Sequence, residues 1–189
     1  MTATIAAPSR TIPALAVREP ATASPAVRAT LALLRIATGF IFLWAFLDKT
    51  FGLGFSTPTD RAWVNGGTPS QGFLMSDAVS GPLKGFFAGL ASPVTDVLFM
   101  AGMLGIGLAV MLGVGLRISA VAGSAIMVLM YLAEWSFTAN AASTNPLVDY
   151  HIIYALALIV IAATAAGDTW GLGRQWKTLP VVRTQSWLY

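Results

Sequence analysis

The sequence predicts an all-α integral membrane protein, a bundle of four transmembrane helices with a long aromatic loop after the first helix. Of the 189 residues, 56% are hydrophobic and only 10% are charged, whereas a soluble domain carries about 25% charged residues on its wetted surface. The charged residues are separated by long uncharged stretches, and these show none of the period-two alternation of barrel strands. Because a backbone in lipid must satisfy its own hydrogen bonds, the stretches are expected to be helices.

The composition excludes several classes of function. With 11 Lys and Arg against 8 Asp and Glu residues, the chain cannot cover the surface of an ordinary soluble enzyme. The net charge of +3 needs no nucleic-acid partner to explain it. The absence of cysteine excludes disulfides, thiolate metal sites and iron–sulfur clusters held by this chain. Its single histidine, His151, has no spaced partner for a haem, and we assign no metal ligands.

Four apolar stretches have the length of membrane spans, since about 20 helical residues cross a hydrocarbon core of roughly 30 Å. Only Arg35 interrupts the first stretch. Residues 1–28, rich in Ala, Thr, Pro and Arg, are expected to be a disordered cytoplasmic segment. The membrane domain then covers residues 29–175, and a cytoplasmic tail covers 176–189. We place the helices at about 29–49, 95–115, 117–137 and 149–167.

The distribution of Lys and Arg orients the chain. Four alternating helices put both tails and the turn between the second and third helices on one side of the membrane. That side carries more basic residues than the other, which has Lys49, Arg61 and Lys84. The positive-inside rule therefore places both termini in the cytoplasm. The basic residues of the cytoplasmic side are Arg10, Arg18, Arg28, Arg117, Arg174, Lys177 and Arg183.

The connection from residue 50 to residue 94 is far longer than the roughly 2–8 residues usual between bundle helices. It is rich in Gly and Pro, and residues 82–90 are expected to form a short interfacial or re-entrant helix. Loops of this length tend to be lids or binding elements, so we expect function near it. Its aromatic residues include Phe51, Phe55, Trp63, Phe73, Phe86 and Phe87.

The second predicted helix carries a small residue at every fourth position. Such a ladder lets a neighbouring backbone approach closely, which is how helices gain contact in lipid. The neighbour is another helix of this chain or a helix of a second copy or partner subunit. The ladder consists of Ala101, Gly105, Ala109 and Gly113.

Titratable residues cluster near the outer ends of the predicted helices. Charged groups inside spans are rare and costly, so each is a functional hypothesis by default. If the bundle closes, these groups share one level beneath the aromatic loop. Interfacial ion pairs and an aromatic belt are the alternative interpretation. The residues at this level are Asp48, Lys49, Glu134, Asp149 and His151.

Such a group suits the reduction of a quinone, either menaquinone or ubiquinone. The reaction needs an apolar slot, a hydrogen-bond donor to each carbonyl and acids connected to water. A histidine titrates near neutral pH, and a partly desolvated glutamate is tuned to do so. We therefore assign proton transfer to Glu134, His151 and Asp48. We assign contact with the quinone to Arg35, Lys49, Trp44, Tyr131 and Trp135.

Three motifs resemble the DoxX/DoxD family. The first is Leu34-Arg35 through Gly39 and Phe42, followed by Lys49 and Phe51-Gly52. The second is the glycine-rich turn from residue 113 to Arg117. The third is the small, basic exit of the fourth helix at residues 167–174. The resemblance covers about residues 30–175.

The resemblance implies a four-helix protein of a bacterial or archaeal plasma membrane. Members of the family include a subunit of thiosulfate:quinone oxidoreductase, which oxidises thiosulfate to tetrathionate and passes electrons to membrane quinone. A chain without cysteine would need a partner protein to supply the sulfur chemistry. The alternatives are a non-catalytic membrane anchor or assembly subunit of a respiratory or redox complex, and a solute or proton pathway. Family membership alone does not decide among these functions.

Overall fold

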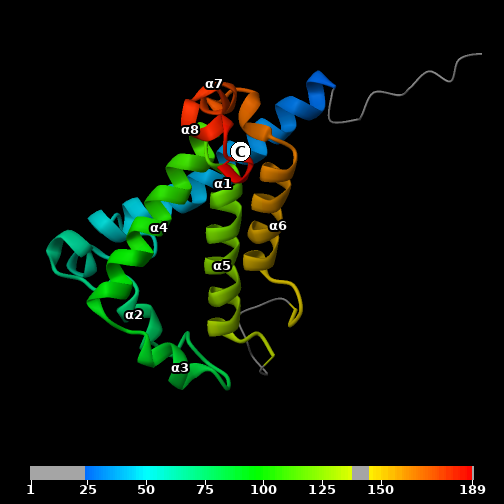
Figure 1. Ribbon diagram of the computed structural model, residues 1–189. Helices are drawn as coiled ribbons and strands as arrows, with labels where there is room; N and C mark the ends of the chain where they lie inside the picture. Colours follow the sequence, from blue (N-terminus) through cyan, green and yellow to red (C-terminus); the bar gives the residue numbers. More distant parts are fainter. Residues whose placement is uncertain (1–23, 138–144, 189) are drawn as a thin grey trace, which may run out of the picture.

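The computed structural model describes residues 24–137 and 145–188, in which every regular element is a helix. Its four longest helices are α1 (Pro25–Phe51), α4 (Pro93–Leu112), α5 (Leu116–Glu134) and α6 (Tyr150–Ala163) (Figure 1). The expected N-terminal segment lies outside the described residues up to residue 23. The shorter elements are η2 (Thr59–Arg61), η3 (Trp63–Asn65), α2 (Gln71–Leu74), α3 (Lys84–Gly89), η4 (Ala166–Asp168), α7 (Gly173–Thr178), α8 (Pro180–Arg183) and η5 (Ser186–Leu188).

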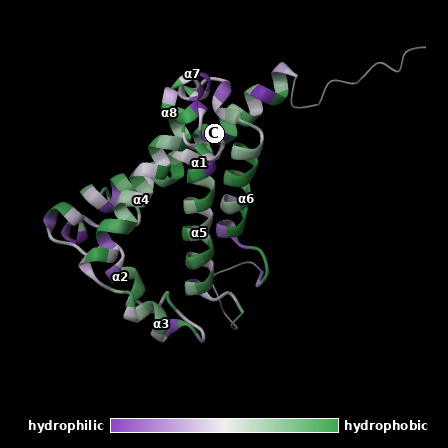
Figure 2. Cartoon of the chain, viewed as in Figure 1, coloured by the Kyte–Doolittle hydropathy of each residue, from purple (hydrophilic) through white to green (hydrophobic). Residues whose placement is uncertain are grey.

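Helices α1, α4 and α5 are each long and apolar enough to cross a membrane. The described residues are thus all-helical, as predicted, and compatible with a membrane protein. Helix α6 is also apolar, except at its first turn (Figure 2). With 14 residues it extends only about 21 Å, at 1.5 Å per residue.

Local sequence explains where the helices begin and end. Helices α1 and α4 both start at a Ser-Pro pair. The hydroxyl of Ser24 accepts a hydrogen bond from the backbone N–H of Val27 at 3.3 Å, and Pro25 supplies the fixed φ suited to a first helical turn. Helix α1 therefore begins at Pro25 and not at residue 29. It ends at Gly52, whose φ of 63° is a left-handed conformation that glycine adopts without strain.

The helices pack in two pairs, α1 with α4 and α5 with α6. Helices α1 and α4 touch backbone to backbone, because a Cβ on Gly39 would lie 2.7 Å from the Met111 nitrogen and one on Gly107 2.7 Å from the Leu43 nitrogen. Ala101 and Gly105 of the predicted ladder face outward and are exposed. Both pairs contribute to one core, which contains Phe42, Met103, Ile106, Val110, Leu116, Ala120, Met127, Ala155, Leu158, Ile161 and Ala166.

The two pairs meet at the end that holds α7 and α8, here called the tail end, and diverge toward the opposite end (Figure 1). Residues 52–92, here called the cap, lie across that opposite end. Leu74, Val79 and Phe87 of the cap pack against Ala133 at the end of α5. The Ser80 N–H also donates to the Ala133 carbonyl at 2.9 Å. The cap thus joins the divergent ends of the two pairs.

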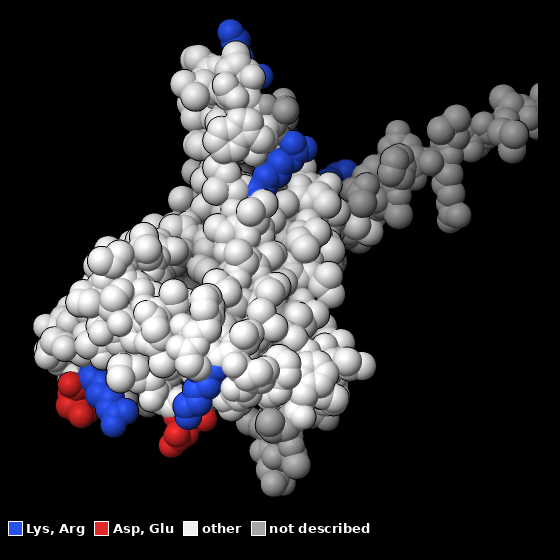
Figure 3. All heavy atoms as spheres, turned by 60° about the horizontal axis from the view of Figure 1, so that its bottom comes forward, with Lys and Arg blue, Asp and Glu red and all other residues white. Residues whose placement is uncertain are grey.

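Charged side chains gather toward the two ends of the molecule, with an uncharged surface between them (Figure 3). At the tail end, Lys177 pairs with Asp168 at 2.6 Å. In the cap, Lys84 lies 3.5 Å from Asp77, and both side chains are exposed. An uncharged surface between two charged ends is the arrangement that a lipid bilayer requires.

Candidate functional site

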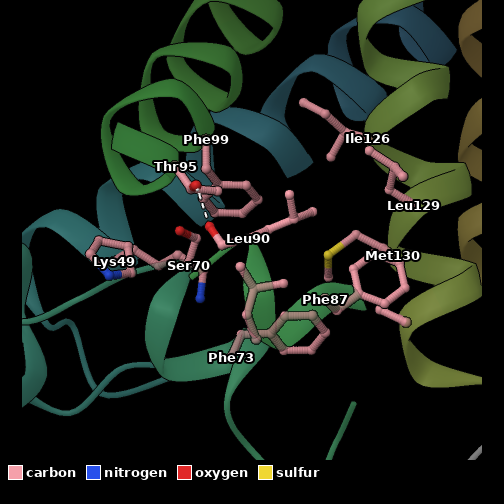
Figure 4. Close-up of a pocket in the computed structure, with 13 residues that line it drawn as sticks. Lys49, Ser70, Phe73, Phe87, Leu90, Thr95, Phe99, Ile126, Leu129 and Met130 are labelled. Atoms are coloured by element: carbon pink, nitrogen blue, oxygen red, sulfur yellow. Dashed lines mark hydrogen bonds between the residues drawn. The ribbon is translucent and has the colours of Figure 1, made fainter. Parts of the chain in front are cut away.

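A cavity of about 160 Å³ lies where the helix pairs diverge, beneath the cap. Figure 4 shows Lys49 and Ser70 on one side of it and Ile126, Leu129 and Met130 of α5 on the opposite side. Phe99 of α4 closes the inner wall. The remaining lining residues are Pro69, Phe73, Leu74, Phe87, Leu90, Thr95 and Ala133. The wall is almost entirely apolar, which is typical of a site for a small organic molecule.

A second hollow, of about 610 Å³, is lined by other residues of the same cap, many of them polar. We call it the outer basin. Its wall includes Arg61 and Asn65, and it shares Lys49, Pro69 and Phe73 with the apolar cavity. Lys49 therefore lies between the apolar cavity and the outer basin.

The ammonium group of Lys49 makes no hydrogen bond or ion pair with any residue of 24–137 or 145–188. Its neighbour Asp48 is buried and engaged elsewhere. The Asp48 carboxylate accepts from the N–H groups of Phe55 and Ser56 at 3.2 and 3.1 Å and from the Ser56 hydroxyl at 2.7 Å. Asp48 thus holds the start of the cap, and it leaves Lys49 available to a ligand.

Asp96 has a similar structural role, which the sequence analysis missed. It lies in the first turn of α4 and is buried. One oxygen accepts from the Ser70 N–H and hydroxyl at 2.7 and 2.6 Å and from the Gln71 N–H at 3.0 Å. The other accepts from the Gln71 amide at 2.5 Å. Asp96 therefore ties α2, which lines the cavity, to α4.

A second polar cluster joins the end of α5 to the start of α6. Glu134, Asp149 and His151 each place one nitrogen or oxygen ligand atom within 4.8 Å of the others. Asp149 Oδ2 lies 2.8 Å from His151 Nδ1, and both side chains are buried. The Tyr150 hydroxyl lies 3.4 Å from each carboxylate oxygen of Glu134. None of these residues lines the apolar cavity.

The residues predicted to form one quinone site therefore lie in separate places. Of the residues assigned to quinone contact, Lys49 lines the cavity. Trp44 packs edge-on against Phe55 of the cap, with ring centroids 5.1 Å apart. The Tyr131 hydroxyl donates to the carbonyls of residues 146 and 147, and Trp135 packs against Gly81.

Arg35 lies far from the predicted slot and is fully buried. Its guanidinium donates to the Val110 carbonyl at 2.8 Å and to the Met111 carbonyl, both at the end of α4. It also donates to the carbonyls of Trp170 at 2.9 Å and Thr169 at 3.4 Å. Arg35 therefore links α1, α4 and the turn after α6, and it does not line the cavity.

Comparison with protein families, with curated proteins and with solved structures found no match to this chain.

Proposed function

We propose that this chain is a quinone-binding membrane protein, the membrane subunit of a quinone-linked oxidoreductase. The observation that supports the proposal is the apolar cavity with Lys49 at its rim. A quinone has an apolar ring and tail with carbonyl acceptors at one end. In the proposed complex the ring lies against Phe99 and Leu129, and Lys49 donates a hydrogen bond to one carbonyl.

The position of the outer basin suggests which end of the quinone lies at Lys49. It meets the cavity at Lys49, so a head group there lies next to polar space while the apolar body faces the gap between the helix pairs. Protons for quinone reduction then come from water in the basin. Glu134 and His151 stay outside this proposal, because neither lines the cavity.

The proposed setting is a bacterial or archaeal plasma membrane with both termini cytoplasmic. In this topology α6 is the fourth span, and the turn at residues 164–168 extends it toward the tail end. The resemblance to the DoxX/DoxD family then suggests a sulfur compound such as thiosulfate as the electron donor. A partner protein would carry out that chemistry, since this chain has no cysteine.

Filling the cavity should strongly reduce the amount of quinone that the purified protein retains. Leu129→Trp places an indole into the cavity. Because the Leu129 side chain is 46% exposed, the substitution should not disturb the packing of the core. The indole would occupy the space in which the quinone ring lies, so the ring could bind only by displacing it, and each 1.4 kcal/mol lost is about tenfold in affinity. We expect at least about tenfold less menaquinone or ubiquinone in solvent extracts of the purified variant.

The matched control is Val128→Trp. Val128 is 43% exposed, lies on the same helix and does not line the cavity. It should retain quinone as the wild type does. Equal quinone content in all three proteins, or none in the wild type, would contradict the proposal.

A membrane anchor without chemistry of its own is the second candidate. The outward-facing Ala101 and Gly105 favour it, because a Cβ added to Gly105 meets nothing within 4 Å in the described residues. Small residues on a lipid-facing surface allow a partner helix to approach closely. A complex that keeps its activity with the cavity filled by Leu129→Trp would support the anchor.

A further inference from the structure

The polar cluster of Glu134, Asp149 and His151 has no place in the quinone site, yet it is among the most enclosed groups of titratable side chains in the described structure. The side chains of His151 and Asp149 are 2% and 4% exposed. The three residues come from the last residue of α5, the N-cap of α6 and the first turn of α6. Their ligand atoms converge within 4.8 Å.

The cluster holds two carboxylates, and in the described residues no Lys or Arg forms an ion pair with Glu134 or Asp149. The partner of Asp149 is His151, at 2.8 Å, which carries a charge only when its imidazole is protonated. With a neutral imidazole the two carboxylates repel each other in a partly dry site. The Tyr150 hydroxyl, at 3.4 Å from the Glu134 oxygens, is too distant for a strong hydrogen bond. A bound cation would remove the repulsion.

The donor atoms indicate which cation fits. One imidazole and two carboxylates are a mixed nitrogen and oxygen set, which suits Zn²⁺ and related transition metals. Mg²⁺ and Ca²⁺ prefer sites made of oxygen alone. Three protein ligands leave a fourth tetrahedral position for water, the arrangement of an open zinc site.

We propose that Glu134, Asp149 and His151 form a divalent transition-metal site, with Zn²⁺ as its best-matched ion, which joins the end of α5 to the start of α6. Asp149 already has its backbone partners, because its Oδ1 accepts from the N–H groups of His151 at 3.0 Å and Ile152 at 3.3 Å. These bonds fix the carboxylate before metal binds. Its Oδ2, 2.8 Å from His151 Nδ1, makes no such bond to the backbone of the described residues, and a bound metal would replace the proton that these two atoms share. The proposal is independent of the quinone cavity.

No metal ligand is predicted from the sequence, because the three ligands do not share one helix or one short motif. Glu134 lies fifteen residues before Asp149 in the chain. Only the antiparallel packing of α5 and α6 brings the end of one helix to the start of the other. The sequence predicts that the three residues lie at one level, but only that packing shows that their ligand atoms converge within 4.8 Å.

The test is a titration of the full chain, purified in detergent and stripped of metal, with Zn²⁺ against a chromophoric chelator. The wild type should bind one Zn²⁺ per chain. Glu134→Gln should weaken binding by more than about 100-fold, since even the loss of a group that only orients a ligand costs about 10–100-fold. Glu134 is half-buried and its loss leaves the Asp149 helix cap intact, so the variant should fold, as a thermal melt would show.

Asp77→Asn is the matched control, because Asp77 is an exposed carboxylate of the cap and should not change Zn²⁺ affinity. Co²⁺ bound to the wild type should give visible absorption bands that His151→Gln abolishes or shifts. Equal Zn²⁺ affinity in the wild type and Glu134→Gln would overturn the proposal. So would a wild type that binds no Zn²⁺, or Mg²⁺ that competes at equal concentration.

Discussion

Arg35→Met should lower the free energy of unfolding by more than about 3 kcal/mol, the largest loss of stability that we expect from any single change in this chain. Arg35 is fully buried and donates to four backbone carbonyls. A hydrogen bond to a charged group contributes about 1.5–3 kcal/mol. Methionine fills a similar volume but donates to none of these carbonyls, so the end of α4 and the turn after α6 lose their common partner.

Thermal unfolding in detergent, followed by circular dichroism, measures this effect. Arg174→Met is the control, because Arg174 lies on α7 and is exposed. It should unfold at nearly the wild-type temperature. If Arg35→Met were as stable as Arg174→Met, the carbonyls would have found other hydrogen-bond partners. The hydrogen bonds of Arg35 would then not be what stabilises the contact between α1 and α4.

Lys49→Met should weaken quinone binding about 10–100-fold while leaving stability almost unchanged. The expected loss is one charged hydrogen bond, about 1.5–3 kcal/mol, converted at about 1.4 kcal/mol per tenfold. Equilibrium dialysis of a short-chain quinone analogue against the purified protein measures it. Methionine retains the apolar stem of lysine, so the shape of the cavity is preserved.

Lys49 also lies in the last turn of α1, where a cation interacts favourably with the helix dipole. A purely structural role of this kind would lower the unfolding temperature of Lys49→Met and leave quinone affinity intact. Lys84→Met is the control for surface charge, because Lys84 is an exposed residue of the cap. It should change neither quantity. The two measurements together separate a ligand contact from a helix-end effect.

The sequence predicted the long helices to within a few residues, because each is an apolar stretch with clear ends. Helix α1 starts earlier than predicted, because the Ser-Pro pair at residues 24–25 begins it. Gly52 and Gly113 end α1 and α4. The predicted interfacial helix at residues 82–90 contains α3. Hydropathy and helix caps depend only on residues close together in the chain, so the sequence alone is enough to predict them.

The site was harder to predict, because burial and partners depend on how the helices meet. The sequence places Asp48 and Lys49 side by side, but only the fold shows that Asp48 bonds the cap while Lys49 faces the cavity. Arg35 was predicted to contact a ligand, because an unpaired cation in an apolar span suggests a functional role. Its actual partners are backbone carbonyls between residues 110 and 170, and the sequence does not show that these lie close to it. Leu129 and Phe99 were indistinguishable from ordinary core residues until the helix pairs were seen to diverge.

Photo-crosslinking can show whether a quinone occupies the cavity beneath the cap. A photoreactive quinone analogue is incubated with the purified protein, and the labelled residues are identified by mass spectrometry. We expect labels on Lys49 and on residues 126–133 of α5, and these labels should be lost when unlabelled quinone is added in excess. Labels spread evenly over the lipid-facing residues of α4 and α6, unchanged by that competitor, would contradict it.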